Sequence, residues 1–223
     1  ITGSQIPLAA LRSDGQTNLL NALYIAANYP IPEVSLFFNN TLFRGNRATK
    51  ADANGFDAFA SPNFRPLLTA GIQIQLREGV LKPLDNTPLQ LTPVSPQAVG
   101  VVTLYPGMAA EIFKNILQQP VKALILQTYG VGNAPQDKQL LNTLADGIAN
   151  GTLIVNRTQC FKGRVNMGGY ATGNALAEIG VISDADMTME ATLTKLHYLL
   201  SQDSTQADKE AFLQQNLRGE LCP

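Results

Sequence analysis

Residues 99–158 read VGVVTLYPGMAAEIFKNILQQPVKALILQTYGVGNAPQDKQLLNTLADGIANGTLIVNRT and contain three apolar runs with longer amphipathic segments between them. The apolar runs predict strands at 99–105, 123–129 and 152–158. The segments between them have helical spacing at 109–117 and 136–149. Strands that alternate with helices form a parallel sheet with helices on both faces, so this stretch predicts an α/β fold.

A proline-rich segment divides the chain. Pro83, Pro88, Pro93 and Pro96 come close together, and proline is unsuited to helix interiors and central strands. We therefore expect an interdomain linker at 77–98, followed by a C-terminal α/β domain at 99–223. Further helices are predicted there at 174–178, 186–200 and 206–217.

Residues 1–76 are expected to be the remainder of an N-terminal domain, because they are fewer than a typical domain contains. Ile1 and Thr2 read as the end of a strand, and residues 18–27 have helical spacing. The β-rich runs 34–38 and 41–44 predict a hairpin that turns at Asn39-Asn40. Residues 51–70 read as loops anchored by phenylalanines.

Composition excludes several classes of protein. The 223 residues are 45% hydrophobic, and 16 basic residues balance 17 acidic ones, which gives a net charge of -1. There is no basic stripe for nucleic acid or for an anionic membrane, so neither is an expected partner. Two distant cysteines and one histidine provide neither a disulfide framework nor a metal-ligand cluster. No metal or cofactor is expected.

Lys50, in the run Gly45-Asn46-Arg47-Ala48-Thr49-Lys50-Ala51, is the first candidate for chemistry. The run lies between the predicted hairpin and the phenylalanine-rich segment, so we expect a polar, structured loop. A lysine that loses solvation there can help to deprotonate a weak nucleophile. The alternative is a solvated cation without a catalytic role.

Gly130-Val131-Gly132-Asn133-Ala134-Pro135 follows a predicted strand, and Pro135 suits the first position of a helix. Free backbone N-H groups there could receive an anion, or the glycines could simply make a tight turn.

Ser4 and Cys160 each follow a predicted strand, where ligands bind in α/β sheets. An ordinary turn serine and an inert thiol are the alternatives. His197, on an apolar helix face, and Asp14, near a turn, are expected to be structural.

Matching runs along the chain resemble the cytoplasmic type I bacterial L-asparaginases. They are Thr2-Gly3-Ser4-Gln5-Ile6-Pro7, Leu11-Arg12-Ser13-Asp14-Gly15, residues 37–62, Tyr129-Gly130-Val131-Gly132-Asn133-Ala134-Pro135, Val165-Asn166-Met167-Gly168-Gly169-Tyr170-Ala171-Thr172-Gly173-Asn174 and Asn216-Leu217-Arg218-Gly219-Glu220. The resemblance implies a two-domain asparaginase-like fold, with a truncated N-terminal α/β domain and a smaller C-terminal α/β domain. The family's Thr-Gly-Gly-Thr-Ile-Gly and Gly-Thr-Asp-Thr segments do not occur among these residues, so an N-terminal segment carrying the nucleophile is expected to be missing.

The resemblance also implies roles for particular residues. Lys50 matches the lysine of a Thr-Lys-Asp proton relay that hydrolyses L-asparagine to L-aspartate and ammonia, in the cytoplasm and without a cofactor. Ser4 lines the substrate pocket, and Asn133 reaches the active site of a neighbouring subunit in a dimer of dimers. Thr49, Gln127 and Cys160 match a second, allosteric asparagine site. There the residue at the position of Gln127 is typically an arginine.

Alternatives to an active asparaginase remain open at this level. The chain alone is expected to be inactive, and it could be a non-catalytic asparagine-binding or structural part, completed by a companion N-terminal fragment. It could also be the asparaginase-like subunit of a tRNA-dependent amidotransferase, although its charge balance does not favour tRNA binding. Discrimination between asparagine and glutamine depends on pocket shape.

Overall fold

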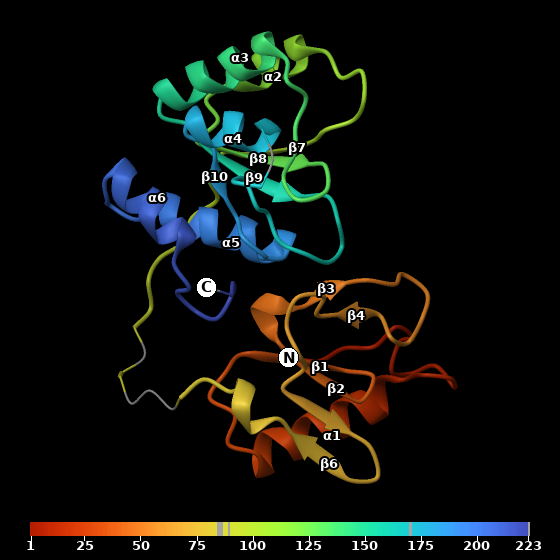
Figure 1. Cartoon of the computed structure of the whole chain (residues 1–223). Coiled ribbons are helices and arrows are strands. Elements are labelled where there is room, and N and C mark those ends of the chain that lie inside the picture. The colour runs from red at the N-terminus through yellow and green to blue at the C-terminus, as the bar shows by residue number, and fades with distance from the viewer. Residues whose placement is uncertain (84–86, 89, 170, 223) are drawn as a thin grey trace. The chain divides into compact units, whose positions relative to one another are not determined.

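The computed structural model describes residues 1–83, 87–88, 90–169 and 171–222, and it forms two compact units (Figure 1). The N-terminal unit comprises Ile1–Gln90 and Arg218–Glu220, and the C-terminal unit comprises Leu91–Leu217 and Leu221–Pro223. Both units are α/β, which confirms the predicted fold class. The domain bounds at 1–76, 77–98 and 99–223 stay predictions, and residues 84–86 and 89 of the proposed linker lie outside the described residues.

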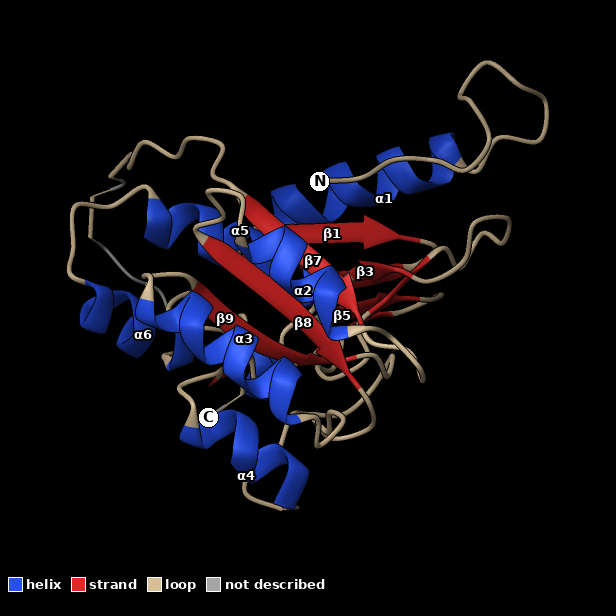
Figure 2. Ribbon diagram, turned by 90° about the horizontal axis from the view of Figure 1, so that it is seen from above, coloured by secondary structure: helices blue, strands red, loops and turns tan. Residues whose placement is uncertain are grey.

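The C-terminal unit is built on a parallel sheet in the order β10-β9-β8-β7. Its strands are β7 (Val99–Thr103), β8 (Ala123–Thr128), β9 (Leu153–Thr158) and β10 (Ile182–Ser183). β7, β8 and β9 match predicted strands and lie side by side in Figure 2. β10 was not predicted, because two residues are too few to show a periodicity.

Helices cover both faces of this sheet, as predicted (Figure 1). α2 (Ala110–Leu117), α3 (Lys138–Ala149) and α4 (Ala171–Glu178) pack on one face, and α5 (Met189–Leu200) and α6 (Gln206–Gln214) pack on the other. Successive residues of a strand point to opposite faces, so Leu124 of β8 joins the first core and Ile125 joins the second. Both are fully buried, which explains why the strands read as continuous apolar runs.

Two helices of the C-terminal unit begin later than the sequence predicted, because polar side chains cap them. Asp137 accepts hydrogen bonds from the N-H groups of Gln139 and Leu140, so α3 begins at Lys138 and Pro135 precedes it. Thr188 accepts from the N-H of Ala191, so α5 begins at Met189 rather than at residue 186. The prediction that Pro135 is a first helical residue is therefore wrong.

The N-terminal unit contains α1 (Gly15–Asn28) and an antiparallel sheet in the order β1-β2-β5-β6. These strands are β1 (Ser35–Phe38), β2 (Thr41–Arg44), β5 (Leu68–Ala70) and β6 (Ile74–Leu76). Asn39 and Asn40 both have positive φ, 43° and 62°, which suits the tight turn of the predicted β1-β2 hairpin. β5 lies within a segment that was predicted to be loops, and β6 was not predicted at all.

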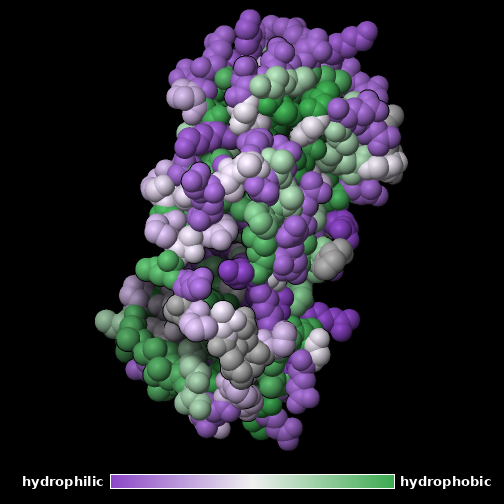
Figure 3. Space-filling model, turned by 90° about the vertical axis from the view of Figure 1, so that its left-hand side faces the viewer, coloured by the Kyte–Doolittle hydropathy of each residue, from purple (hydrophilic) through white to green (hydrophobic). Residues whose placement is uncertain are grey.

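α1 presents apolar side chains on its outer face. Its buried residues are Gly15, Asn18 and Ile25, whereas Leu20 and Leu23 are 67% and 59% exposed. Apolar side chains gather at the lower left of the surface in Figure 3, on the N-terminal unit. An exposed apolar helix face of this kind is typical of a surface that contacts another protein segment.

The chain returns to the N-terminal unit at Arg218–Glu220, and two buried arginines hold it there. The guanidinium of Arg44 donates to the carbonyl oxygen of Gly219, and that of Arg47 donates to the carbonyl oxygen of Glu220. Arg44 is also paired with Glu33 through two nitrogen-oxygen contacts and stacks 4.2 Å above the Phe64 ring. Burial opposes ionisation of Glu33, but the hydrogen bonds and positive charge of Arg44 outweigh the effect of burial and lower the pKa of Glu33.

Candidate active site

Lys50 lies on a short strand rather than in a loop. β3 (Thr49–Lys50) pairs antiparallel with β4 (Phe59–Ala60), and Lys50 is directly opposite Phe59. The expectation of a loop is therefore wrong, because residues 59 and 60 supply a pairing partner that local composition does not reveal. A strand fixes the backbone of Lys50 more firmly than an open loop would.

Two kinds of contact hold the amine of Lys50. Its Nζ donates to Oε1 of Gln5 at 2.5 Å. It also lies 4.9 Å from the centre of the Phe59 ring and 5.9 Å from that of Phe38, within the range of cation-π attraction. The two rings lie 5.1 Å apart and tilted by 58°. These contacts give the amine a fixed direction. The side chain is also exposed, so the amine has access to solvent.

The turn that carries Ser4 and Gln5 is organised by Asp14. One Asp14 oxygen accepts from the N-H groups of Gln5 and Ile6, each at 3.0 Å, and the other accepts from the Asn18 amide at 3.1 Å. Burial opposes ionisation of Asp14, but the hydrogen bonds from Ile6 and Gln5 prevail and lower its pKa. Asp14 is thus structural, as expected from the sequence. Ser4 is exposed on this turn.

Ile1 and Thr2 run beside β1. Ile1 donates to the carbonyl of Ser35 and accepts from the N-H of Phe37, which is the bonding pattern of a parallel pair. The Oγ1 of Thr2 donates to the carbonyl of Phe37. Ser4 therefore follows the end of an extended segment alongside the sheet, close in sequence to Gln5, which contacts Lys50.

Residues 129–133 of the C-terminal unit form a tight turn that presents Asn133. Tyr129 and Asn133 exchange two backbone hydrogen bonds of 2.9 Å, and Gly130 and Gly132 have φ of +49° and +113°. The N-H groups of Gly132 and Asn133 both donate to the carbonyl of Tyr129. Of the two alternatives from the sequence, the tight turn therefore accounts for these two N-H groups, and the glycines serve it.

A buried network of polar side chains on β8 and β9 holds the backbone of this turn. Thr128 Oγ1 donates to Asn156 Oδ1 at 2.6 Å, and Asn156 Nδ2 donates to the carbonyl of Gly132 at 3.0 Å. Thr158 Oγ1 donates to the carbonyl of Gly130. Sequence reasoning missed this network. The available signal was polar residues within otherwise apolar strands, which must be hydrogen-bonded when buried.

Gln127 and Cys160 lie at the C-terminal ends of neighbouring strands, whereas Thr49 belongs to the other unit. Gln127 is paired in register with Arg157 of β9, and its Oε1 accepts from Thr103 Oγ1 at 2.6 Å. Cys160 is an exposed, free thiol, and its N-H donates to Thr158. The carboxyl edge of the sheet thus carries polar groups on three adjacent strands.

His197 is structural in this fold. Its Nδ1 accepts a hydrogen bond of 3.0 Å from the N-H of Gln97, so this nitrogen is not available as a base.

Within the described ranges no group of three metal-ligating side chains occurs, and none of the helices described is long and apolar enough to cross a membrane.

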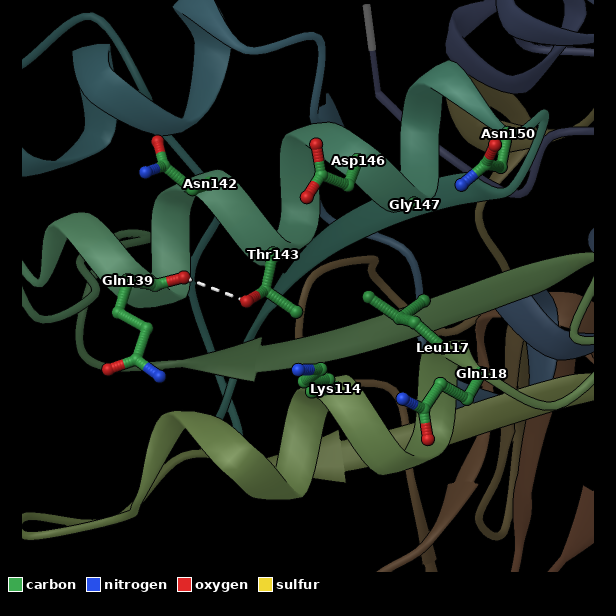
Figure 4. A pocket seen from close by; sticks show the side chains of 9 residues that line it. All are labelled: Lys114, Leu117, Gln118, Gln139, Asn142, Thr143, Asp146, Gly147 and Asn150. Atoms are coloured by element: carbon green, nitrogen blue, oxygen red, sulfur yellow. Dashed lines mark hydrogen bonds between the residues drawn. The ribbon is translucent and has the colours of Figure 1, made fainter.

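A groove of about 480 Å³ lies between α2 and α3, far along the chain from Lys50 (Figure 4). None of the predicted site residues lines it. Its walls carry one lysine, one aspartate and several amides, among them Lys114, Asp146 and Gln139. At its floor a Cβ on Gly147 would come within 3.0 Å of Leu117, so the glycine allows the two helices to pack closely.

The fold and these residues define a two-unit α/β protein, in which Gln5 and two aromatic rings contact the amine of Lys50 and the parallel sheet has a polar carboxyl edge. Residues 1–81 match the family model "Asparaginase, N-terminal", and residues 98–213 match the model "Glutaminase/Asparaginase C-terminal domain". The chain therefore belongs to the asparaginase family.

Three relatives illustrate the similarity. The chain is 63% identical to L-asparaginase 1 of Escherichia coli over 223 residues, which is 100% of the chain and 66% of that protein. It is 46% identical to the human 60 kDa lysophospholipase, covering 100% of the chain and 39% of that protein. The chain is 57% identical in sequence to L-asparaginase I from Vibrio cholerae, and it matches the crystal structure of that protein with a TM-score of 0.95. The match covers 100% of this chain and 67% of the Vibrio cholerae chain. The chain thus spans about two thirds of the length of the E. coli relative.

Proposed function

We propose that this protein hydrolyses the side-chain amide of L-asparagine to L-aspartate and ammonia, without a cofactor, in the cytoplasm. The observation that carries the proposal is the 63% identity to an L-asparaginase along the whole chain, together with both family-model matches. The fixed amine of Lys50 adds support, because it gives the site a group that can move a proton.

In the proposed mechanism a threonine hydroxyl attacks the side-chain amide carbon, the C-N bond breaks and ammonia leaves, and water then hydrolyses the threonine ester to release L-aspartate. The family's nucleophilic threonine belongs to an N-terminal segment outside the 223 residues, so the chain alone is proposed to be inactive. In the attack step Lys50 acts as a neutral amine: it takes the hydroxyl proton and becomes an ammonium beside an aspartate of that segment. The proton transfer is needed because a free hydroxyl is a weak nucleophile at neutral pH. Ser4 is proposed to contact the substrate from its turn.

Asn133 is proposed to complete the site of a neighbouring subunit within a dimer of dimers. The rigid turn at 129–133 supports this role, because a residue that acts across an interface must be held in a fixed position. The exposed apolar face of α1 supports association in general. Thr49, Gln127 and Cys160 are proposed to form a second, regulatory asparagine site.

Release of ammonia tests the proposed reaction. The chain alone and the protein completed by its N-terminal segment are each incubated with L-asparagine or L-glutamine. Release of fatty acid from lysophosphatidylcholine is measured in parallel, because the human relative is named a lysophospholipase. Ammonia release from asparagine by the completed protein, and none by the chain alone, is expected, and the kcat/KM values for the two amides measure the preference between asparagine and glutamine. Asparagine binding without turnover would favour the non-catalytic alternative, and saturable binding of tRNA would favour the amidotransferase subunit. Mass spectrometry of the same preparation reports whether a companion fragment is present.

A further inference from the structure

Gln5 uses every hydrogen-bonding group of its side chain. Its Oε1 accepts from Lys50 Nζ at 2.5 Å, and its Nε2 donates to the carbonyl oxygens of Gly55 at 2.8 Å and Ala53 at 3.2 Å. An amide nitrogen has two hydrogens, and both are directed at carbonyls here. The amide oxygen is therefore the group that faces the amine, and the surroundings of Gln5 fix this orientation.

Both ends of Gln5 are anchored. Its backbone N-H lies 3.0 Å from each oxygen of the Asp14 carboxylate. The carbonyls that hold its amide belong to a turn that Asp52 closes, because Asp52 Oδ1 accepts from the N-H groups of Asn54 and Gly55. These bonds from Gly55 and Asn54 lower the pKa of Asp52, so the carboxylate stays charged at neutral pH. Gln5 thus connects two rigid turns.

Lys50 depends on such a partner for its position. A lysine amine sits on a flexible four-carbon chain and is strongly hydrated, so an exposed lysine samples many rotamers. Phe59 and Phe38 attract the amine from the side, but a ring face does not fix a single hydrogen-bond direction. The oxygen of Gln5 supplies that direction.

We propose that Gln5 is a positioning residue, which holds the amine of Lys50 where the proton relay requires it. The catalytic part of this inference rests on the proposed function. That function assigned no role to Gln5, and the inference adds one. A misplaced proton acceptor reduces turnover without weakening substrate binding, because correct geometry is needed at the transition state.

The first test needs no enzymatic activity. Lys50 is acetylated with a neutral succinimidyl ester, and the rate is measured by mass spectrometry relative to the exposed Lys162. In Gln5→Met the amine loses its acceptor, and the relative rate is expected to rise about tenfold, the effect of one charge-assisted hydrogen bond. The matched control is Gln75→Met, the same change at an exposed position on β6, and it should leave the rate unchanged. An unchanged rate in Gln5→Met overturns the proposal.

The second test is a double-mutant cycle on the turnover of the protein completed by its N-terminal segment. Gln5→Met is expected to lower kcat by about tenfold to a hundredfold with KM nearly constant, and to cause no further loss in a Lys50→Met background. An equal loss in both backgrounds, or a change in KM alone, overturns the role of Gln5. If Lys50→Met itself keeps full turnover, the proposed relay fails, and the acetylation rates alone decide whether Gln5 positions the amine. Thermal unfolding checks each variant, and Gln5→Asn, one methylene shorter, replaces Gln5→Met if that variant does not fold.

Discussion

Arg157 and Asp184 face each other at the ends of two neighbouring parallel strands, with 3.6 Å between Arg157 Nε and Asp184 Oδ2. This distance is too long for a hydrogen bond, and Arg157 Nε is buried with no hydrogen-bond partner. Asp184 is 1% exposed and accepts from Thr192 Oγ1 at 3.1 Å, and Asp186 is close enough to repel its charge. Burial outweighs the attraction of Arg157 and raises the pKa of Asp184 to about 8.

The raised pKa of Asp184 predicts that stability falls with increasing pH. In the unfolded chain this carboxyl loses its proton near pH 3.8, whereas in the folded protein it keeps the proton up to about pH 8. Between these values the folded state binds more protons, so its free energy of unfolding decreases as pH rises, by up to about 1.4 kcal/mol per pH unit. Urea unfolding between pH 5 and pH 8 measures this slope.

Asp184→Asn is the control, because an amide of nearly the same shape does not titrate. Its free energy of unfolding should depend less on pH over that range than that of the unmodified protein. Equal slopes in the two proteins would show that Asp184 is ionised in the folded state at neutral pH and is stabilised by Arg157 after all.

The parallel sheet was predictable from the sequence because its strands are buried on both faces. β8 runs ALILQT, and such a run between two helical segments has few other interpretations. The short strands were not predictable. β3 and β10 have two residues each. β3 forms because its backbone pairs with Phe59–Ala60, and β10 forms because its backbone pairs with β9. Pairing of this kind is a tertiary property, which local composition does not contain.

The site was only partly predictable for a similar reason. Lys50 could be chosen from the sequence, since the resemblance to asparaginases supplied a role for it. Gln5 could not, because it lies 45 positions away and its importance comes from three contacts made after folding. The polar residues Thr128 and Asn156 within apolar strands were a signal that the sequence analysis did not use.

In the protein completed by its N-terminal segment, replacing Lys50 with methionine should remove most of the turnover and leave the fold intact. Methionine keeps the length and the apolar stem of lysine, so the contacts with Phe59 and Phe38 should remain, but it cannot transfer a proton. We expect kcat for asparagine to fall by about 10²- to 10⁴-fold, the usual contribution of a general acid or base. Circular dichroism and the unfolding midpoint report on the fold, and near-normal turnover would remove Lys50 from the mechanism.

Two glycines of the 129–133 turn should differ in their sensitivity to alanine. At Gly130 a Cβ would meet no atom within 4 Å, so Gly130→Ala should cost about 1 kcal/mol, from the positive φ alone. At Gly132 a Cβ would lie 2.8 Å from Val165 Cγ1 and 3.0 Å from Asn156 Nδ2. Gly132→Ala should therefore cost about 3 kcal/mol, because steric overlap adds to the strain. Chemical denaturation measures both, and equal costs would argue against this packing.

Mixing two inactive variants tests whether Asn133 acts across a subunit interface. Lys50→Met and Asn133→Ala are each expected to lack activity. In a mixed dimer one site would combine the intact Lys50 of one subunit with the intact Asn133 of the other, so activity should return on mixing. Sedimentation at assay concentration should show an oligomer throughout, as a symmetric obligate interface requires. Activity in a monomer, or no recovery after mixing and subunit exchange, would place Asn133 outside the neighbouring site.

The last prediction concerns regulation through Gln127. In related enzymes an arginine at this position could bind the carboxylate of a regulatory asparagine through two hydrogen bonds. Glutamine is neutral, and the loss of a charge-assisted pair worth about 1.5–3 kcal/mol should weaken effector binding about tenfold to a hundredfold. An effector that binds more weakly shifts the equilibrium between states less at a given concentration. We therefore expect a nearly hyperbolic rate curve with asparagine, and sigmoidality in Gln127→Arg.

Arg157 is a second candidate for the effector's carboxylate, because its backbone is paired in register with that of Gln127 on the neighbouring strand, although its guanidinium lies beside Asp184. Rate curves are recorded for the unmodified protein, Gln127→Arg and Arg157→Leu. If the unmodified protein is strongly sigmoidal and Arg157→Leu is hyperbolic, Arg157 binds the effector and the proposed effect of Gln127 is wrong. If Gln127→Arg stays hyperbolic although calorimetry shows that it binds asparagine at a second site, then binding at this edge of the sheet is not coupled to turnover.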